Sequence, residues 1–157
     1  MLDIIYTDVR AWLISLGMLP EQVISAYNNL APIPNDGVIM TILFDSNLDQ
    51  TSTEYTKDQA HINNSVKVTM QIDCYGEQSY DRARKIATLW FSMPTCDFLQ
   101  NTVPLTTAIT PKDLSFTNET GQYELRFMTT LELQYNTNYE QSIETLTTIP
   151  NVDIIGI

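Results

Sequence analysis

The chain has 157 residues, of which 43% are hydrophobic, so one domain with a sizeable core is expected. Only 17% are charged, and 19 acids outnumber 8 basic residues, which gives a net charge of −11. Nucleic acids and anionic membranes are bound by clustered Lys and Arg, so this composition argues against both as partners. No apolar run approaches the roughly 18 residues of a membrane helix.

The first element is predicted to be a helix over residues 3–16. Apolar residues recur there at helical spacing, and Gly17 follows as a stop. Early acids and the lack of a basic leader argue against a signal peptide. The apolar face of this helix consists of Ile5, Val9, Trp12, Leu13 and Leu16.

Two strands are predicted next. Residues 22–27 alternate weakly, which indicates a short edge strand, whereas residues 38–45 are almost continuously apolar. A continuous apolar run is typical of a strand that is covered on both faces, so we expect the second strand to be central. A turn rich in Pro, Asn, Asp and Gly separates the two strands.

The segment 46–64 is polar and has no hydrophobic period. This pattern predicts either a long loop or an extended hairpin arm, poorly ordered until it binds a partner. Leu48, Tyr55 and Ile62 are its sizeable apolar residues, enough to anchor the segment on a neighbour but too few for a core.

The strongest metal-binding candidate also fails in this region. Asp45-x-Asn47-x-Asp49 begins like a calcium loop, but Gln50 stands where Gly is needed and Thr56 where a bidentate Glu is needed. The chain's one histidine, His61, allows neither a multi-histidine metal site nor a His-paired nucleophile. We therefore expect no metal, no cofactor and no enzymatic activity.

A strand followed by a helix forms the predicted nucleus of the fold, within residues 65–99. Gly76 separates the two elements, Ser79 is the predicted N-cap of the helix, and Pro94 is its predicted stop. The strand alternates strictly, with Val66, Val68, Met70, Ile72 and Cys74 on its apolar face. The helix, residues 79–93, places Ala83, Ile86, Ala87, Trp90 and Met93 on one face.

The last part of the chain is predicted to contain one long strand. Residues 100–121 indicate an irregular crossover, and residues 123–135 then alternate over thirteen positions. Because typical strands have about five or six residues, this one is expected to project beyond the domain body and to pair antiparallel with residues 66–74. Residues 143–157 are a predicted C-terminal extension, in which residues 152–157 are expected to pair with another strand.

These elements indicate the α+β class: a mainly antiparallel, mixed sheet with two helices packed on one face. We expect residues 1–157 to form a single domain. Cys74 and Cys96 are predicted to be reduced, buried thiols, as is usual for a cytosolic product.

Basic residues offer two further candidates. Arg82, Arg84 and Lys85 form either a basic patch or a solvated helix face that neutralises nearby Asp81 and Asp73, and we favour the second interpretation. On the last strand, Arg126 shares the polar face with Glu124. It could form an ion pair within the chain or one between subunits, and the sequence leaves both open.

Two blocks of sequence resemble the tail terminators, a family of neck proteins of long-tailed bacteriophages. The first is a strand that ends in Tyr-Gly and leads into the following helix; the second leads into the last strand. The resemblance covers residues 8–135 and depends on the order and spacing of both blocks. Its residues are Tyr75-Gly76, Tyr80-Asp81-Arg82-Ala83-Arg84, Cys96-Asp97-Phe98-Leu99, Pro104-Leu105, Phe116, Gly121-Gln122-Tyr123-Glu124 and Arg126.

The resemblance implies a structural virion protein, assembled in the host cytoplasm. Such proteins form a homo-oligomeric ring, usually a hexamer, that binds the last ring of the tail tube protein and ends tube growth. The ring then joins the tail to the head connector, with the tail sheath as a further candidate partner. DNA passes through the lumen without specific binding, which suits an acidic chain. Partner contacts are predicted at Leu48, Asp49, Glu54, Tyr55, Lys57, Asp58 and Arg126.

A second hypothesis is a small acidic inhibitor that mimics DNA and blocks a nucleic-acid enzyme. It requires carboxylates spaced like phosphates along one face, whereas the acids here are spread singly along the chain. Mass measurement in solution separates the two hypotheses, since only the first expects a ring.

Overall fold

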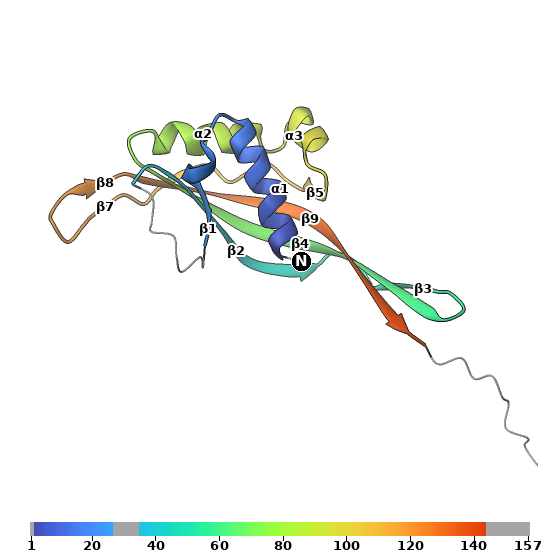
Figure 1. Ribbon diagram of the computed structural model, residues 1–157. Coiled ribbons are helices and arrows are strands. Elements are labelled where there is room, and N and C mark those ends of the chain that lie inside the picture. The colour runs from blue at the N-terminus through green and yellow to red at the C-terminus, as the bar shows by residue number, and fades with distance from the viewer. Residues whose placement is uncertain (1, 27–34, 144–157) are drawn as a thin grey trace, which may run out of the picture.

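The computed structural model describes residues 2–26 and 35–143. In Figure 1 all the helices lie on one face of a long, twisted sheet, which confirms the predicted α+β class. The helices are α1 (Leu2–Ser15), the 3₁₀-helix η1 (Pro20–Gln22), α2 (Ser79–Leu89) and α3 (Met93–Phe98). The strands are β1 (Val23–Ser25), β2 (Gly37–Asn47), β3 (Ser52–Tyr55), β4 (Gln59–Tyr75), β5 (Thr102–Pro104), β6 (Lys112–Asp113), β7 (Phe116–Thr117), β8 (Tyr123–Glu124) and β9 (Arg126–Ser142).

The main sheet has the order β1-β2-β4-β9-β5, with β3 added to β4 and β6 added to β9. Among the strands that the structure describes, only β1 and β2 pair in parallel, so the sheet is mixed but mainly antiparallel, as predicted. Strands β4 and β9 pair over their full length of 17 residues, with Val66 opposite Tyr135 and Cys74 opposite Phe127. The predicted antiparallel pairing of these two segments is therefore confirmed. The expected pairing of residues 152–157 lies outside the described residues.

The core lies between the helices and one face of the central strands. The five predicted apolar positions of β4 are all buried, as are Leu131 and Leu133 of β9. Helix α1 contributes Ile5, Val9 and Leu13 to the same cluster, together with Trp12. The Trp12 and Trp90 rings pack edge to face with their centroids 5.1 Å apart, and the Trp12 Nε1 donates to Thr95 Oγ1 at 3.0 Å. Helix α1 and strands β4 and β9 thus follow the hydrophobic period of their sequences.

The helical region differs from the prediction, because two helices replace one. Helix α2 ends at Leu89, and Pro94 lies in the first turn of α3 instead of stopping a longer helix. Proline is accepted there since the first helical N–H groups have no intrahelical acceptor, and Ser92 Oγ caps the turn by accepting from Thr95 N. Met93, expected on the buried face, is 76% exposed, and Ala87 is only partly buried.

Two smaller predictions about this region were also wrong or incomplete. Ser79 is the first residue of α2, whose N-cap is Gln78, so the Ser79 hydroxyl does not cap the helix. Of the two free thiols, Cys74 is buried as expected, while Cys96 is only partly buried. Burial raises the pKa of Cys74 to about 12, which makes this thiol unreactive.

Strand β2 is internal to the sheet, but the prediction that it is covered on both faces was wrong. Its first residues are buried, whereas Leu43 and Phe44 are 48% and 58% exposed. A β-bulge lies between Ile42 and Phe44, where the register against β4 shifts. An extra residue at a bulge breaks the alternation of a strand, so an unbroken apolar run did not mean two covered faces here.

The segment 46–64 was predicted to be either a long loop or an extended hairpin arm, and the structure shows the hairpin. Strand β3 pairs with the beginning of β4 across a tight turn, and β9 pairs with the other edge of β4. We call residues 48–65 and 136–142 together the arm. Figure 1 shows the arm projecting from the body of the protein, so the long last strand does extend beyond the core.

At its other end, the long strand is interrupted at Leu125. Tyr123 and Glu124 form β8, which pairs with β7 in a separate two-stranded sheet. Among the residues that the structure describes, no helix is long and apolar enough to cross a bilayer.

Candidate interaction surfaces

The arm has two different faces, and the strand register defines them. Ala60 lies opposite Tyr55 on β3, and Ile62 lies opposite Tyr139 on β9. Residues paired across strands share a face, and these four continue the face that the helices cover in the body. Within this group, Tyr55 and Tyr139 are 73% and 55% exposed. The opposite face of the arm carries Ser52, Glu54, His61, Asn63, Asn138 and Glu140.

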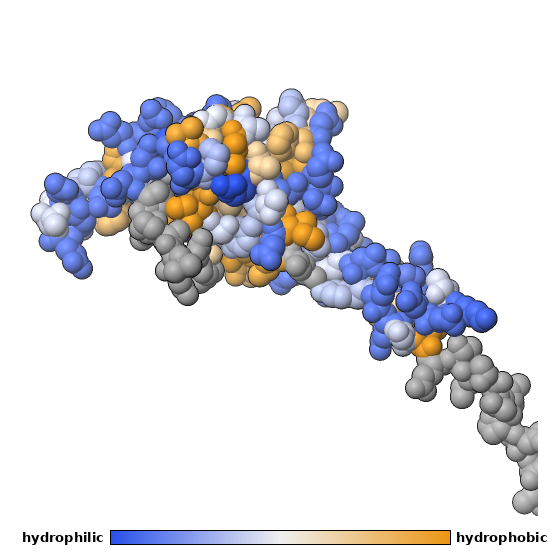
Figure 2. Space-filling view, viewed as in Figure 1, coloured by the Kyte–Doolittle hydropathy of each residue, from blue (hydrophilic) through white to orange (hydrophobic). Residues whose placement is uncertain are grey.

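Negative charge dominates the surface of the arm. His61 stands between the two carboxylates that pair with it across the strands, and its Nδ1 is 3.5 Å from Glu140 Oε1. In Figure 2 the arm is almost entirely hydrophilic, in contrast to the apolar areas on the body. Apart from His61, the charged residues of the arm are Lys57 and the acids Asp49, Glu54, Asp58 and Glu140.

Hydrogen bonds also hold the base of the arm. The Leu48 N–H donates to Ser65 O at 2.9 Å, and the Ser65 N–H donates to Asp49 Oδ1 at 3.4 Å. Asn64 Nδ2 donates to Asn47 Oδ1 at 2.8 Å. The arm is therefore a hydrogen-bonded, three-stranded ribbon, and its ordering on binding a partner stays a prediction. Three strands can satisfy one another's backbone groups where a lone polar segment cannot.

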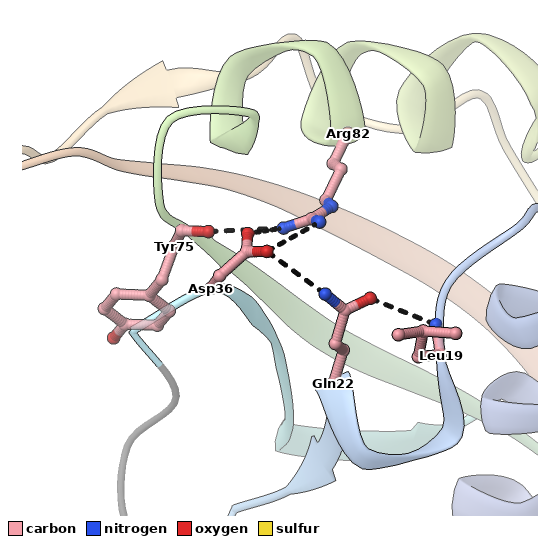
Figure 3. Close-up of polar contacts among 5 residues, drawn as sticks. All are labelled: Leu19, Gln22, Asp36, Tyr75 and Arg82. Atoms are coloured by element: carbon pink, nitrogen blue, oxygen red, sulfur yellow. Dashed lines mark hydrogen bonds and ion pairs between the residues drawn. The ribbon is translucent and has the colours of Figure 1, made fainter.

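A polar network joins three elements and the turn before β2 at the end of the sheet that is remote from the arm (Figure 3). Arg82 of α2 pairs with both carboxylate oxygens of Asp36, and it also donates to Tyr75 O at 3.4 Å. Gln22 Nε2 donates to Asp36 Oδ2 at 3.1 Å and links η1 to the network. The hydrogen bonds from Arg82 lower the pKa of Asp36 below its usual value. Gly76 adopts a positive φ of 96° beside this pair, where an added Cβ would lie 2.8 Å from Asp36 Oδ1.

The basic residues of α2 were predicted to form a solvated face that neutralises Asp81 and Asp73, and for Arg82 and Lys85 these partners were wrong. The Arg82 guanidinium pairs with Asp36 instead, and Lys85 Nζ donates to Leu16 O at 2.7 Å. Both partners precede α2 by many residues, so the helix spacing alone could not reveal them.

Arg126 forms an ion pair within the chain, which is one of the two alternatives that the sequence left open. Its Nε and Nη2 atoms lie 2.9 Å and 2.8 Å from Asp73 Oδ1, and Gln71 Nε2 donates to the other carboxylate oxygen at 2.6 Å. The guanidinium also lies over the Tyr75 ring, 5.7 Å from its centroid. Burial raises the pKa of Tyr75, although the nearby Arg126 opposes this shift.

The predicted partner-binding residues therefore do not form one site. Leu48, Asp49, Glu54, Tyr55, Lys57 and Asp58 all lie in the arm. Arg126 is the first residue of β9, whereas the arm contains the last residues of this strand. At about 3.3 Å per residue, this separates Arg126 from the tip of the arm by roughly 50 Å.

An open cleft of about 450 Å³ lies near Arg126, at the junction of β4 and β8. Its lining contains two carboxylates, of Glu77 and Glu124, but no Ser, Cys, His or Lys that could act as a nucleophile. In the described ranges, no three His, Cys, Asp or Glu side chains are grouped to hold a metal ion. The cleft is lined by Asn35, Tyr75, Gly76, Glu77, Gln122, Tyr123, Glu124 and Leu125.

Sequence reasoning missed two features of the structure. The buried carboxylate of Asp8 accepts hydrogen bonds from the backbone N–H groups of residues 100–102 and so holds β5 against α1. An acid at the edge of the apolar stripe of α1 was the available signal. The second feature is the exposed pair Leu43 and Phe44, for which the sequence gives no separate signal because a bulge causes it.

The family model for the phage neck terminator protein matches residues 3–157, nearly the whole chain. No curated protein matches this sequence significantly.

Proposed function

The chain belongs to the phage neck terminator protein family, and on this premise we propose that it forms a ring that caps the tail tube and ends its polymerisation. Membership makes it a structural protein of the bacteriophage neck and places it in the virion. The ring, with six copies as the expected number, joins the tail to the head connector. Tail tube protein, connector protein and tail sheath are the proposed partners, and assembly takes place in the host cytoplasm.

The arm is the observation that supports this function best. A ribbon that leaves the core and exposes both faces adds little stability to the protomer for its length. It does, however, reach surfaces that the body cannot touch. We propose that the arm contacts the neighbouring virion proteins through Leu48, Tyr55 and the charged residues between them. Arg126, bound to Asp73, would act in this scheme only by stabilising the remote end of the sheet.

The distribution of charge supports the proposal that DNA slides through the lumen of the ring. The sheet face opposite the helices carries Lys67, Lys112 and Arg126. Lys67 and Arg126 are paired: Lys67 Nζ lies 3.1 Å from Glu132 Oε1, and Arg126 pairs with Asp73. Paired cations bind phosphate weakly, and the net charge of −11 repels it. The DNA-mimic alternative has no comparable support, because four acids of the arm stand beside a lysine and a histidine instead of forming a regular row.

The test uses tail tubes assembled without this protein. Native mass spectrometry of the purified protein should give a ring, and electron microscopy should show tubes capped at one end and of uniform length. A monomer or dimer that leaves the tubes growing would contradict the proposal.

A matched pair of variants tests the role of the arm. Tyr55→Ser changes an exposed side chain of the arm, whereas Tyr123→Ser changes one of similar exposure, 66%, at the opposite end of the protein. The double variant Leu48→Ser/Tyr55→Ser should cap tubes at least tenfold more weakly than the parent, while Tyr123→Ser should cap normally. Equal capping by both would remove the arm from the proposed mechanism.

A further inference from the structure

We infer that the outer edge of β9 in the arm, residues 136–142, binds an extended, neutral-to-basic segment of another tail protein by strand addition. The inference rests on the proposed function for the source of this segment. It goes further by assigning the binding mode, the backbone atoms and the chemistry of the partner.

The direction of the backbone groups of β9 follows from its hydrogen bonds in the body. Glu132 O accepts from Leu105 N and Thr130 O accepts from Ile109 N, both at 3.0 Å and both on the side away from β4. In antiparallel strands successive residues bond alternately to the two sides. The even-numbered residues of β9 therefore direct N–H and C=O outward, and the odd-numbered residues direct theirs to β4.

Hydrogen bonds at the tip agree with this assignment. The Ile143 N–H, at an odd position, donates to Asp58 O at 3.1 Å on the β4 side. No register shift occurs along the β4–β9 ladder, so the alternation holds from the body to the tip. The N–H and C=O groups of Asn136, Asn138 and Glu140 consequently point away from β4.

Coverage of this edge stops where the arm begins. In the body, β5 and β6 and the segment between them bond to β9 from Arg126 to Tyr135. Within the ranges that the structure describes, no strand pairs with the same edge over residues 136–142. Seven residues provide roughly 23 Å of open edge at about 3.3 Å per residue.

Most of the usual protection of an open edge is missing here. Proteins protect such edges with charged side chains, above all Lys, and with Pro, bulges or very short strands. Glu140 is the one charged residue of this edge. Residues 136–142 contain neither Pro nor Lys, and their ladder has no bulge. The other edge of the arm, β3, has only four residues and is protected by its shortness. This difference selects β9 as the binding edge.

Charge determines which segment can bind. Glu140 lies on the edge itself, Glu54 lies two strands away on β3, and Asp58 lies in the turn between β3 and β4. Lys57 is the only Lys or Arg of the arm. A second arm would bring the same acids to the same edge and would be repelled at short range. A segment with Lys or no charge is attracted, and apolar residues at alternate positions would extend the face of Ile62 and Tyr139.

Asn138 offers a sharp test, because its N–H points outward and does not bond to β4. Asn138→Pro removes this donor, which an edge strand tolerates, and leaves the β4–β9 ladder complete. Asn138→Ala changes the same side chain but keeps the donor. Circular dichroism and thermal unfolding should show both variants folded like the parent.

The probe is an eight-residue peptide in which valine alternates with lysine or threonine, used beside a peptide with glutamate in place of lysine. In fluorescence anisotropy, the lysine peptide should bind the parent and Asn138→Ala, and bind Asn138→Pro at least tenfold more weakly. Its affinity should fall as NaCl is raised, and the glutamate peptide should bind at least tenfold more weakly. Equal binding of both peptides, or of the lysine peptide to both variants, would overturn the inference.

Assembly distinguishes the possible sources of the segment. If the inference holds, Asn138→Pro forms the same ring as the parent but fails to join tails. Loss of the ring itself would mean that a second copy occupies the edge, which would overturn the assignment to another protein. Normal rings and normal tails would overturn strand addition altogether. Failure of the proposed function is seen separately, as absence of capping by the parent protein.

Discussion

Replacing Trp90 by alanine tests how the helical layer packs on the sheet. The Trp90 side chain is fully buried, stacks edge to face with Trp12, and its Nε1 donates to Glu132 O at 3.3 Å. Removing a buried Trp typically costs about 3–5 kcal/mol through lost transfer energy and the cavity left behind. The aromatic pair itself contributes about 0.5–1.5 kcal/mol. Since domains are stable by only about 5–15 kcal/mol, Trp90→Ala should remove a large fraction of the total.

Thermal unfolding followed by far-UV circular dichroism measures this loss. For a chain of this size each kcal/mol lowers the melting temperature by about 2–4 °C, so a decrease of at least about 6 °C is expected. Phe91→Ala is the matched control, because Phe91 is the next residue and is 50% exposed. A Trp90→Ala variant that melts within 2 °C of the parent would refute the packing described for α2.

Two further predictions concern buried and paired carboxylates. Asp8→Ala leaves the N–H of Thr102 and its two predecessors without their acceptor, which should cost about 3 kcal/mol in urea unfolding, whereas exposed Asp3→Ala should cost almost nothing. Because Arg82 lowers the pKa of Asp36, this carboxylate stabilises the folded state above about pH 3.8 and loses that effect as the pH falls through its folded pKa. Asp36 is half exposed, so the effect should stay below about 1 kcal/mol, and Asp36→Asn should abolish it in acid titrations of stability.

The difference between an apolar and a polar face of a strand explains which elements the sequence could predict. Residues 66–74 and 127–135 alternate because one side of each strand meets the helices, so the same contrast that stabilises the sheet is visible in the sequence. In the arm both faces reach solvent, and strand β3 consequently shows no alternation. A ribbon held by backbone hydrogen bonds has no required side-chain pattern, which is why the sequence of segment 46–64 could not separate a hairpin from a loop.

The candidate surfaces were only partly predictable for a related reason. Apolar and charged residues marked segment 46–64 as partner-binding, and the structure places all of them in the arm. The partners of Arg82 and Arg126 depend on which distant segments the fold brings together, and local spacing does not encode this. The open edge of β9 is a property of backbone atoms, so side-chain types could not indicate it.

The β4–β9 ladder runs through both the body and the arm and therefore links their strand registers. Because the side-chain period of a strand is two, a slip of one residue between β4 and β9 would move Leu131 and Leu133 out of the core. The core therefore fixes the register, and the unbroken ladder carries that register to the tip of the arm. The outward direction of the Asn138 N–H is thus determined by the burial of residues that lie in the body. A large change at the arm surface can leave the fold intact, whereas a core change that alters the register would reverse the faces of the arm.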